Sequence, residues 1–301
     1  MSSLLALSNN LADTVEQAGS AVVAVNAGKR ICSSGIHWRN GIIITSDESL
    51  GRYEEITITL SDGETRPVSF VGHDPSTDIA VFQLQNHELP AIAIGDGTNL
   101  KVGHLVLGLA RGSEGDLRAA MGAVSVVGGA WRSMSGGNID QFIRPDITFY
   151  PGFAGGPLVD AAGYIVGMNT SGRRGTVLTI PAATIDRVLN QLLTRGHISR
   201  GYLGVGMQPV RLPSNLKTAL NLTTATGVIV VNVEPSSPAD NAGLLLGDVL
   251  VKFDGIAVSN TDDVLALLNN SDRIGKQIKV QLVRGGALVD LDILIGERPA
   301  E

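Results

Sequence analysis

The chain has 301 residues, of which 44% are hydrophobic and 17% charged, a composition that suits one or two globular domains with substantial cores. Its formal net charge of -6 is spread without runs, which argues against a nucleic-acid binder because such a protein needs a basic face. A single cysteine, Cys32, excludes an intrachain disulfide. The 37 glycines and the 4% of aromatic residues favour a turn-rich β architecture.

Targeting signals are weak. Residues 1–7 lack a basic start and a long apolar core, so they make a poor signal peptide. No stretch reaches the roughly 18 consecutive apolar residues of a membrane span. As written, the sequence predicts a cytoplasmic protein without a membrane span. A periplasmic or extracytoplasmic protein whose leader had been removed would look the same.

The first expected element is an amphipathic helix over about Ser3–Ala18, where Leu and Ala recur at helical spacing. Strand-like runs follow, separated by Gly, Asp and Asn turns such as Asp62-Gly63. Closely spaced strands without long helices between them predict an antiparallel barrel or a pair of barrels. A helix over Ala182–Leu193 ends this part. The predicted strands are Ala21–Asn26, Gly41–Thr45, Ile56–Leu60, Arg66–Gly72, Ile79–Leu84, Leu105–Leu109, Gly122–Val127 and Ile165–Asn169.

A second unit is expected to begin near residues 196–200. Short strands over Gly227–Val233, Gln277–Arg284 and Leu288–Ile295, with a helix around Thr261–Asn270, fit a small α+β domain. We therefore predict two domains, residues 1–196 and residues 197–301.

Three segments of the first domain resemble the HtrA/DegP family of trypsin-like serine proteases. The family's histidine strand matches Gly41-Ile42-Ile43-Ile44-Thr45-Ser46-Asp47-Glu48, and its aspartate turn matches Asp74-Pro75-Ser76-Thr77-Asp78-Ile79-Ala80-Val81. Its Gly-Asn-Ser-Gly-Gly-Pro-Leu nucleophile loop matches Gly152-Phe153-Ala154-Gly155-Gly156-Pro157-Leu158. The resemblance implies two six-stranded barrels of trypsin type.

The catalytic triad positions implied by this resemblance are Glu48, Asp78 and Ala154. Triad chemistry requires a hydroxyl whose proton passes to a neutral imidazole held by a buried carboxylate. An alanine supplies no hydroxyl, and a glutamate beside Asp78 adds like-charge repulsion. Two independent losses are hard to attribute to one engineered change. We therefore predict a catalytically degenerate relative, a pseudoprotease.

Alternatives remain open at the triad positions. The chain could be an active protease carrying an engineered Ser→Ala change and an unusual base, although a glutamate with a pKa of about 4 is a weak base for serine. Other residues could replace the missing base or nucleophile. We expect His37 and His73, however, to be surface or turn residues, and Ser133 and Ser135 to be loop residues and not nucleophiles. A metal held by Glu48, Asp78 and a histidine lacks any ligand spacing, so we predict neither a metal nor a cofactor.

The oxyanion hole could survive these losses. In the family it is formed by backbone N–H groups, which here belong to Gly152 and Ala154 and do not depend on the lost side chains. Gly155 and Gly156 still permit the tight turn. Alternatively Phe153, where the family has a small polar residue, fills the old cleft.

The second domain resembles a PDZ domain. Arg200-Gly201-Tyr202-Leu203-Gly204-Val205 is similar to its carboxylate-binding loop, and the segments at 236–244 and 247–250 strengthen the match. The resemblance implies a peptide-binding site at Arg200, Tyr202, Leu203, Gly204 and Val205, with the helix near Thr261–Asn270 as the other groove wall and Leu265 or Leu268 as apolar lining. Alternatively Leu203 and Val205 only face the core and the groove stays empty.

The fold class we predict is therefore mostly β, a trypsin-like double β-barrel followed by a small α+β PDZ domain. The predicted function is peptide or protein C-terminus binding through the PDZ groove without cleavage, in an adaptor, chaperone-like or regulatory role. Family members assemble as trimers through an aromatic-rich N-terminal segment. No Phe, Tyr or Trp precedes Trp38 here, so a homo-oligomer is expected only if another contact forms it.

Overall fold

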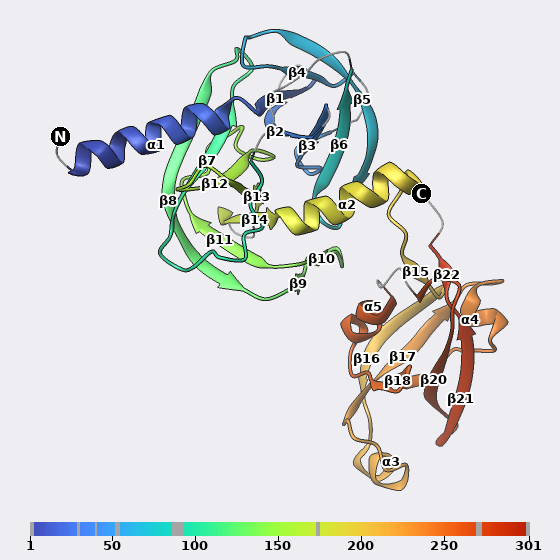
Figure 1. Ribbon diagram of the computed structural model, residues 1–301. Helices are drawn as coiled ribbons and strands as arrows, with labels where there is room; N and C mark the ends of the chain where they lie inside the picture. The colour runs from blue at the N-terminus through green and yellow to red at the C-terminus, as the bar shows by residue number, and fades with distance from the viewer. Residues whose placement is uncertain are drawn as a thin grey trace. The chain divides into compact units, whose positions relative to one another are not determined.

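The computed structural model describes residues 3–28, 31–39, 41–51, 55–85, 93–172, 175–268 and 273–298, without the side chains of Ile31 and Cys32. The chain divides into two compact units, Met1–Ile198 and Ser199–Glu301. Each unit is drawn in Figure 1, the first in blue to yellow and the second in orange to red.

The first unit begins with a closed six-stranded antiparallel barrel in the order β1-β2-β3-β6-β5-β4. Half of the buried residues in its core are Val and Ile, which suit a pleated, buried surface. The Asp62-Gly63 turn joins β4 to β5, as its sequence predicts, with Gly63 at a φ of 81°. The strands are β1 Val22–Ala27, β2 Ile31–Arg39, β3 Ile42–Thr45, β4 Thr57–Thr59, β5 Thr65–Asp74 and β6 Ile79–Leu84.

A second closed antiparallel barrel follows in the order β11-β14-β13-β12-β7-β8. A short two-stranded hairpin, β9–β10, lies between β8 and β11 in the chain. The strands are β7 Leu105–Arg111, β8 Leu117–Gly128, β9 Trp131–Arg132, β10 Asn138–Ile139, β11 Phe142–Asp146, β12 Pro157–Asp160, β13 Ile165–Ser171 and β14 Val177–Pro181.

Two helices flank the barrels. α1 (Ser3–Gly19) packs its C-terminal half on the core through Leu11, Val15 and Ala18, whereas its first turns are exposed. α2 (Ala182–Arg195) buries a face against both barrels and ends at Gly196, whose N–H donates to Leu192. Both helices confirm the predicted ones to within two residues.

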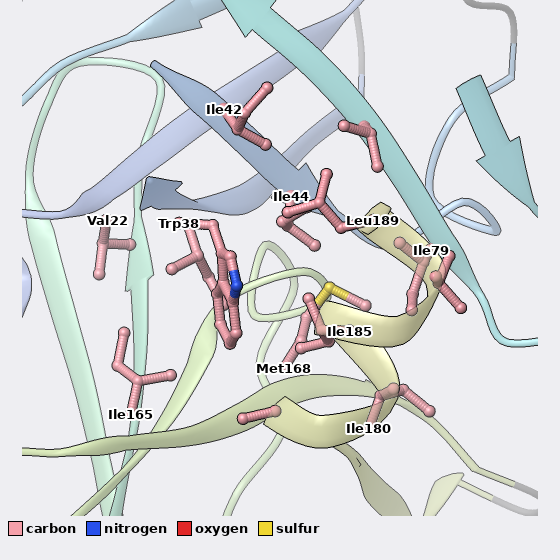
Figure 2. Close-up of a cluster of buried hydrophobic side chains, with 14 of the residues drawn as sticks. Val22, Trp38, Ile42, Ile44, Ile79, Ile165, Met168, Ile180, Ile185 and Leu189 are labelled. Atoms are coloured by element: carbon pink, nitrogen blue, oxygen red, sulfur yellow. The ribbon is translucent and has the colours of Figure 1, made fainter. Parts of the chain in front are cut away.

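The largest hydrophobic cluster joins the two barrels to α2. Figure 2 shows Trp38 and Ile44 from the first barrel, Ile165 and Met168 from the second, and Ile185 from α2 meeting in this cluster. The Trp38 indole N–H donates to the Asp186 carboxylate at 2.8 Å, so its polar atom is satisfied at the edge of an otherwise apolar contact. This shared core fixes the relative position of loops that come from different barrels.

In its described residues, the second unit contains a sheet path of five strands, an additional short strand and three helices. The path runs β16-β17-β18-β20-β21, which leaves β16 at an edge, and β19 pairs with β18. A separate pair, β15–β22, joins the start of the unit to its end. Its elements are β15 Gly201–Tyr202, β16 Val205–Arg211, α3 Ser214–Ala219, β17 Thr226–Val233, α4 Pro238–Asn241, β18 Val249–Phe253, β19 Ile256–Ala257, α5 Thr261–Leu268, β20 Gln277–Arg284, β21 Ala287–Leu294 and β22 Gly296–Glu297.

The predicted fold class is confirmed: the protein is mostly β, with two six-stranded barrels followed by a small α+β unit. Nine of the expected segments differ from the observed strands only at their ends, and β6 and β20 agree at both ends. Strands β2, β11, β12 and β14 were not predicted. The last two residues of the helix expected at Thr261–Asn270 lie outside the described residues. Within the described part of the chain, no helix is both long and apolar enough to cross a membrane.

Candidate functional site

The turn that carries Asp78 is built by a second aspartate. The Asp74 carboxylate accepts hydrogen bonds from the Ser76 N–H at 3.1 Å, the Ser76 hydroxyl at 2.7 Å and the Thr77 hydroxyl at 2.8 Å. All three of these residues are buried. Short polar side chains that bond to nearby backbone groups stabilise such turns, so the Asp-Pro-Ser-Thr-Asp sequence encodes this one locally.

Asp78 accepts hydrogen bonds from neighbouring groups of the chain at both of its carboxylate oxygens. Its Oδ1 accepts the Glu48 N–H at 2.7 Å, and its Oδ2 accepts the Ser46 hydroxyl at 2.8 Å and the Thr170 hydroxyl. Thr170 lies on β13 of the second barrel, so the contact joins the two barrels. Both hydroxyls use the same carboxylate oxygen.

Burial is the main cause that raises the pKa of Asp78 above its ordinary value. The hydrogen bonds from Thr170, Glu48 and Ser46 act in the opposite direction, and the charge of Glu48 raises the pKa further. The charge of the Glu48 carboxylate therefore acts on Asp78, although the Glu48 side chain is exposed.

The two histidines considered as substitute bases are engaged elsewhere. His37 is only 4% exposed on β2, and its Nε2 accepts the Gly41 N–H at 3.2 Å. His73 on β5 places Nδ1 2.9 Å from Oδ1 of Asp47, the residue before Glu48. The expectation that His37 is a surface or turn residue is wrong, because it is buried within the first barrel.

The Pro151–Leu158 loop makes two tight turns around Ala154. The Phe153 N–H donates to the Tyr150 carbonyl at 3.1 Å, and the Gly156 N–H donates to the Phe153 carbonyl at 3.1 Å. The Ala154 carbonyl accepts the Ser34 N–H at 2.9 Å, and the Ser34 hydroxyl donates to the Gly152 carbonyl at 2.7 Å. Ser34 on β2 therefore fixes the loop from the first barrel.

The backbone N–H groups of Gly152 and Ala154 have no acceptor within the part of the chain that the structure describes. Two such donors in one turn could stabilise a carbonyl or carboxylate oxygen. The resemblance of this loop to the family's nucleophile loop predicts that the two donors act together as an oxyanion hole.

Phe153 does not fill a cleft. Its ring is 1% exposed and packs in the core of the second barrel with Ile147 and Leu158. The rings of Phe149 and Tyr150 lie 6.5 and 5.8 Å from it, centroid to centroid. The alternative in which Phe153 blocks the old site is therefore wrong, because an apolar ring is more stable within the core than in an open cleft.

A cavity of about 780 Å³ lies beside Glu48 and Asp78. Its other lining residues come from the β9–β10 hairpin and from β11, β13 and β14 or the turns next to them. Neither Gly152 nor Ala154 lines it. The lining residues are Asp47, Glu48, Pro75, Ser76, Thr77, Asp78, Trp131, Ser133, Met134, Ser135, Ile139, Phe142, Arg144, Thr170, Ser171, Gly172, Thr176, Leu178 and Ile180.

The β9–β10 hairpin is attached to the Asp74–Asp78 turn. The Ser133 hydroxyl donates to the Ser76 carbonyl and accepts the Gly137 N–H at 3.0 Å. A side chain at 137 would approach the same carbonyl to 2.3 Å, so only a glycine allows this contact. Ser133 is thus committed to holding the hairpin.

In the second unit, the loop over residues 200–205 offers two free donors. The N–H groups of Leu203 and Gly204 have no acceptor in the described ranges, whereas the carbonyls of both residues accept bonds from Ala239 and Glu234. Leu203 is 2% exposed in the core and Val205 packs against it. The side chains anchor the loop while its donors stay unpaired.

Strand β16 presents an open edge beside this loop. It pairs only with β17 in the sheet path, and α5 lies next to it. On α5, Val264 and Leu268 are buried, and Leu265 is 39% exposed. Leu265 can therefore line a groove, whereas Leu268 belongs to the core. The Tyr202 hydroxyl donates to Glu234, and this bond is the first cause of the raised pKa of Tyr202.

Ser34, Ser46 and Thr170 also shape the site, and sequence reasoning missed all three. Ser46 lies two residues before Glu48 and could have been found by asking which nearby hydroxyl reaches Asp78. Thr170 is 92 residues from Asp78 in the chain, and no local signal marks it. Within the described residues, no group of three or more His, Cys, Asp or Glu side chains is placed to hold a metal ion.

Comparisons of the sequence with known families agree with both halves of the fold. Residues 33–168 match the family described as a trypsin-like peptidase domain, and residues 201–295 match the PDZ domain family. Among curated proteins, the chain is 29% identical over 271 residues to a probable periplasmic serine endoprotease DegP-like of Chlamydia pneumoniae, an alignment covering 87% of this chain and 54% of that protein. It is 32% identical over 266 residues to the protein of the same description from Pseudomonas putida (strain GB-1), covering 86% and 54%. The chain thus spans about half the length of the curated relatives it matches.

Solved structures are similar over almost the whole chain. An HtrA-type protease, AlgW, with a tripeptide is 30% identical with a TM-score of 0.76, covering 96% of this chain and 98% of that one. The same protease with a decapeptide is 26% identical with a TM-score of 0.78, covering 96% and 99%. These relatives have both the double barrel and the smaller unit that follows it.

Proposed function

The chain belongs to the HtrA-type family of trypsin-like peptidases with a C-terminal PDZ domain, and from this we propose that it is a pseudoprotease that binds peptides without cleaving them. The observation that carries the proposal is the pair of residues at the nucleophile and base positions, Ala154 and Glu48. A methyl group cannot attack a carbonyl, and a carboxylate stands where triad chemistry uses an imidazole.

The contacts of Asp78 support this proposal. In a working triad, the carboxylate holds the imidazole through a hydrogen bond to one of its oxygens. Here Oδ2 already accepts the Ser46 and Thr170 hydroxyls, and Oδ1 accepts the Glu48 N–H. Asp78 is thus held by three hydrogen bonds in the absence of a histidine, and the proposal does not require Glu48 to act as a base.

The PDZ domain is the proposed binding module. The free N–H groups of Leu203 and Gly204 can receive a terminal carboxylate, and the open edge of β16 can receive the peptide as an additional strand. Arg200 and Tyr202 belong to this loop, and the partly exposed Leu265 offers an apolar contact from α5. The proposed ligands are protein C-termini or exposed apolar peptide segments, and the proposed role is that of an adaptor, a chaperone-like holder or a regulator of active relatives.

The location and assembly of the protein are also proposals. The curated relatives are named as periplasmic proteins, which favours a periplasmic location over a cytoplasmic one for this chain. A homo-oligomer is the proposed assembly, which light scattering on the purified protein tests.

The second candidate function is that of an active serine endopeptidase carrying an engineered Ser→Ala change. The intact turns around Ala154 and the unpaired Gly152 and Ala154 N–H groups favour it, because they would suit a serine equally well. Glu48 opposes it, since restoring serine alone still leaves no imidazole.

Hydrolysis of fluorescently labelled casein distinguishes the two candidates. The parent protein, Ala154→Ser and Glu48→His are each expected to release no more dye than buffer alone. A fluorophosphonate probe, which labels any contaminating serine protease, controls for impurities. Casein cleavage by the parent or by Ala154→Ser, without a labelled contaminant, would show that the endopeptidase interpretation is correct.

Fluorescence polarisation with labelled peptides tests the binding function. Peptides with an apolar residue and a free carboxylate at the C-terminus are expected to bind, and the same peptides with a C-terminal amide to bind at least about tenfold more weakly, because the amide removes the charge that the loop N–H groups receive. Equal binding of both forms would exclude C-terminus recognition.

A further inference from the structure

The cavity beside the triad positions is acidic on one side. Asp47, Glu48 and Asp78 all line it. Asp47 contacts His73, and Asp78 accepts three hydrogen bonds. The Glu48 carboxylate has no ion-pair or hydrogen-bond partner within the described ranges of the chain. Three neighbouring carboxyl groups with one uncompensated charge favour the approach of a cation.

The cationic side chain already present in this cavity does not neutralise that charge. Arg144 lines the cavity but is exposed, and its Nε donates to the Ser125 hydroxyl at 3.2 Å. No ion pair joins Arg144 to Glu48 among the residues described. The carboxyl groups therefore outnumber the positive charges on the lining.

Aromatic and aliphatic side chains also line the cavity. Trp131 and Phe142 lie edge to face with centroids 5.3 Å apart, and Leu178 is a further lining residue. Met134, at the tip of the β9–β10 hairpin, is 85% exposed. Such a lining suits the aliphatic stem of a lysine or arginine, whose charged end can also interact with aromatic faces.

We propose that this cavity is a second binding site, separate from the PDZ groove, for a protein segment that inserts a lysine or arginine side chain toward Glu48. The cavity of about 780 Å³ is much larger than one side chain needs, so apolar residues flanking the basic one occupy the rest against Trp131, Phe142 and Leu178. The proposal does not depend on the PDZ domain binding C-termini. In this view, the Glu48 that is useless as a base is the residue that selects the ligand.

The test uses the full chain and a labelled hexapeptide, Ala-Leu-Lys-Leu-Ala-Ala, acetylated and C-terminally amidated so that it offers no terminal carboxylate to the PDZ loop. A second peptide has norleucine, an uncharged analogue of similar length, in place of lysine. Fluorescence polarisation should show the lysine peptide binding about fivefold more tightly, the size expected for a partly exposed ion pair.

Matched variants locate the site. In Glu48→Gln, the affinity for the lysine peptide should fall to that for the norleucine peptide. Glu114→Gln removes the same charge from an exposed turn of the same unit outside the cavity, and it should leave the lysine preference unchanged. Met134→Ser should lower the affinity for both peptides about twofold. Leu265→Asp in the PDZ domain should leave the affinity for both unchanged. Urea midpoints confirm that each variant is folded.

Three outcomes would overturn the proposal. They are equal affinity of the two peptides, no detectable binding of either, and an equal loss of the lysine preference in Glu48→Gln and Glu114→Gln. The last outcome would assign the preference to the overall negative charge of the chain.

Discussion

Gly155 and Gly136 have nearly the same backbone conformation, with φ of 81° and 82°, but very different surroundings. A Cβ at Gly155 would lie 2.1 Å from the Ser34 carbonyl oxygen and 2.5 Å from the Thr45 hydroxyl. A Cβ at Gly136 would meet nothing within 4 Å. An alanine would be strained by the positive φ at both positions, but its Cβ would collide with neighbouring atoms only at Gly155.

We therefore expect Gly155→Ala to lower the free energy of unfolding by about 3 kcal/mol and Gly136→Ala by about 1 kcal/mol. Urea unfolding of the full chain, followed by tryptophan fluorescence, measures both. Equal losses would mean that the loop around Ala154 can move away from Ser34, contrary to the close packing of the two barrels at this point.

The raised pKa of Asp78 predicts a pH dependence of stability. Burial is its first cause, so the folded protein holds the Asp78 proton more tightly than the unfolded chain does. The resulting stabilisation is complete below the ordinary value of 3.8 and is lost as the pH rises through the higher folded-state pKa. Asp78→Asn cannot titrate, so its stability relative to the parent should improve as the pH rises from 4 to about 7.

Urea unfolding of parent and variant at several pH values in this range measures the difference. Asp96→Asn, at an exposed turn of the same unit, is the control and should show no such trend. A relative stability of Asp78→Asn that stays constant or falls with rising pH would contradict burial as the dominant cause.

Individual residues also show where sequence reasoning stops. The Asp-Pro-Ser-Thr-Asp turn could be predicted because its stabilising contacts lie within five residues, and Glu48 and Ala154 could be placed because their segments are distinctive. Phe153 could not be placed, since a large apolar residue in a loop can face either a cleft or a core, and only the arrangement of the second barrel decides. Thr170 reaches Asp78 only because the two barrels pack together.

At the scale of elements, the β9–β10 hairpin is held from two sides. Ser133 attaches it to the Asp74–Asp78 turn, and α2 holds its base. The Thr184 hydroxyl accepts the Asp140 N–H at 2.9 Å and donates to the Asp140 carboxylate at 2.6 Å. Arg187, one turn later, donates to the Asn138 carbonyl at 2.6 Å. The cavity wall formed by this hairpin therefore depends on α2.

Thr184→Val keeps the shape of a fully buried side chain but leaves the Asp140 N–H without its acceptor. We expect a loss of about 1–2 kcal/mol in the free energy of unfolding, the cost of removing hydrogen bonds at a part-buried site. Thr194→Val, on the exposed end of the same helix, should change it by less than about 0.5 kcal/mol. Urea denaturation compares them, and a similar small effect at both positions would argue that α2 does not hold the hairpin.

The elements themselves were unequally predictable. Strands such as β6 and β20 have continuous or alternating Val, Ile and Leu, which fix both type and boundaries. β2 contains Ser, Gly and His in its middle and reads as a loop, although it pairs with both β1 and β3. β12 has only four residues directly after the nucleophile loop, too few for a periodic pattern to appear. Both β2 and β12 are stabilised by pairing with neighbouring strands, and a local sequence pattern does not reveal this pairing.

At the scale of the whole molecule, the two units have separate cores. One set of buried clusters is made only from residues of the first unit, and the other, around Leu250, Phe253 and Val280, only from residues 199–301. Within the second unit, the Arg284 guanidinium pairs with the 2% exposed Asp248 carboxylate at 2.7–2.8 Å and ties β20 to the start of β18. A unit that satisfies its own buried charge and encloses its own core should fold alone.

We therefore expect residues 199–301, expressed alone, to unfold cooperatively in urea and to bind a peptide with a free apolar C-terminus within about twofold of the affinity of the full chain. Residues 1–198 alone should keep the preference for the lysine peptide over the norleucine peptide, because every residue that lines the acidic cavity belongs to that unit. Arg284→Met leaves Asp248 buried without its cation. In the fragment of residues 199–301 it should lower the free energy of unfolding by about 3 kcal/mol or more, which tests whether the fragment has the native ion pair. If C-terminal peptide binding required both fragments in one chain, the separation of two binding sites on two independently folded units would be wrong.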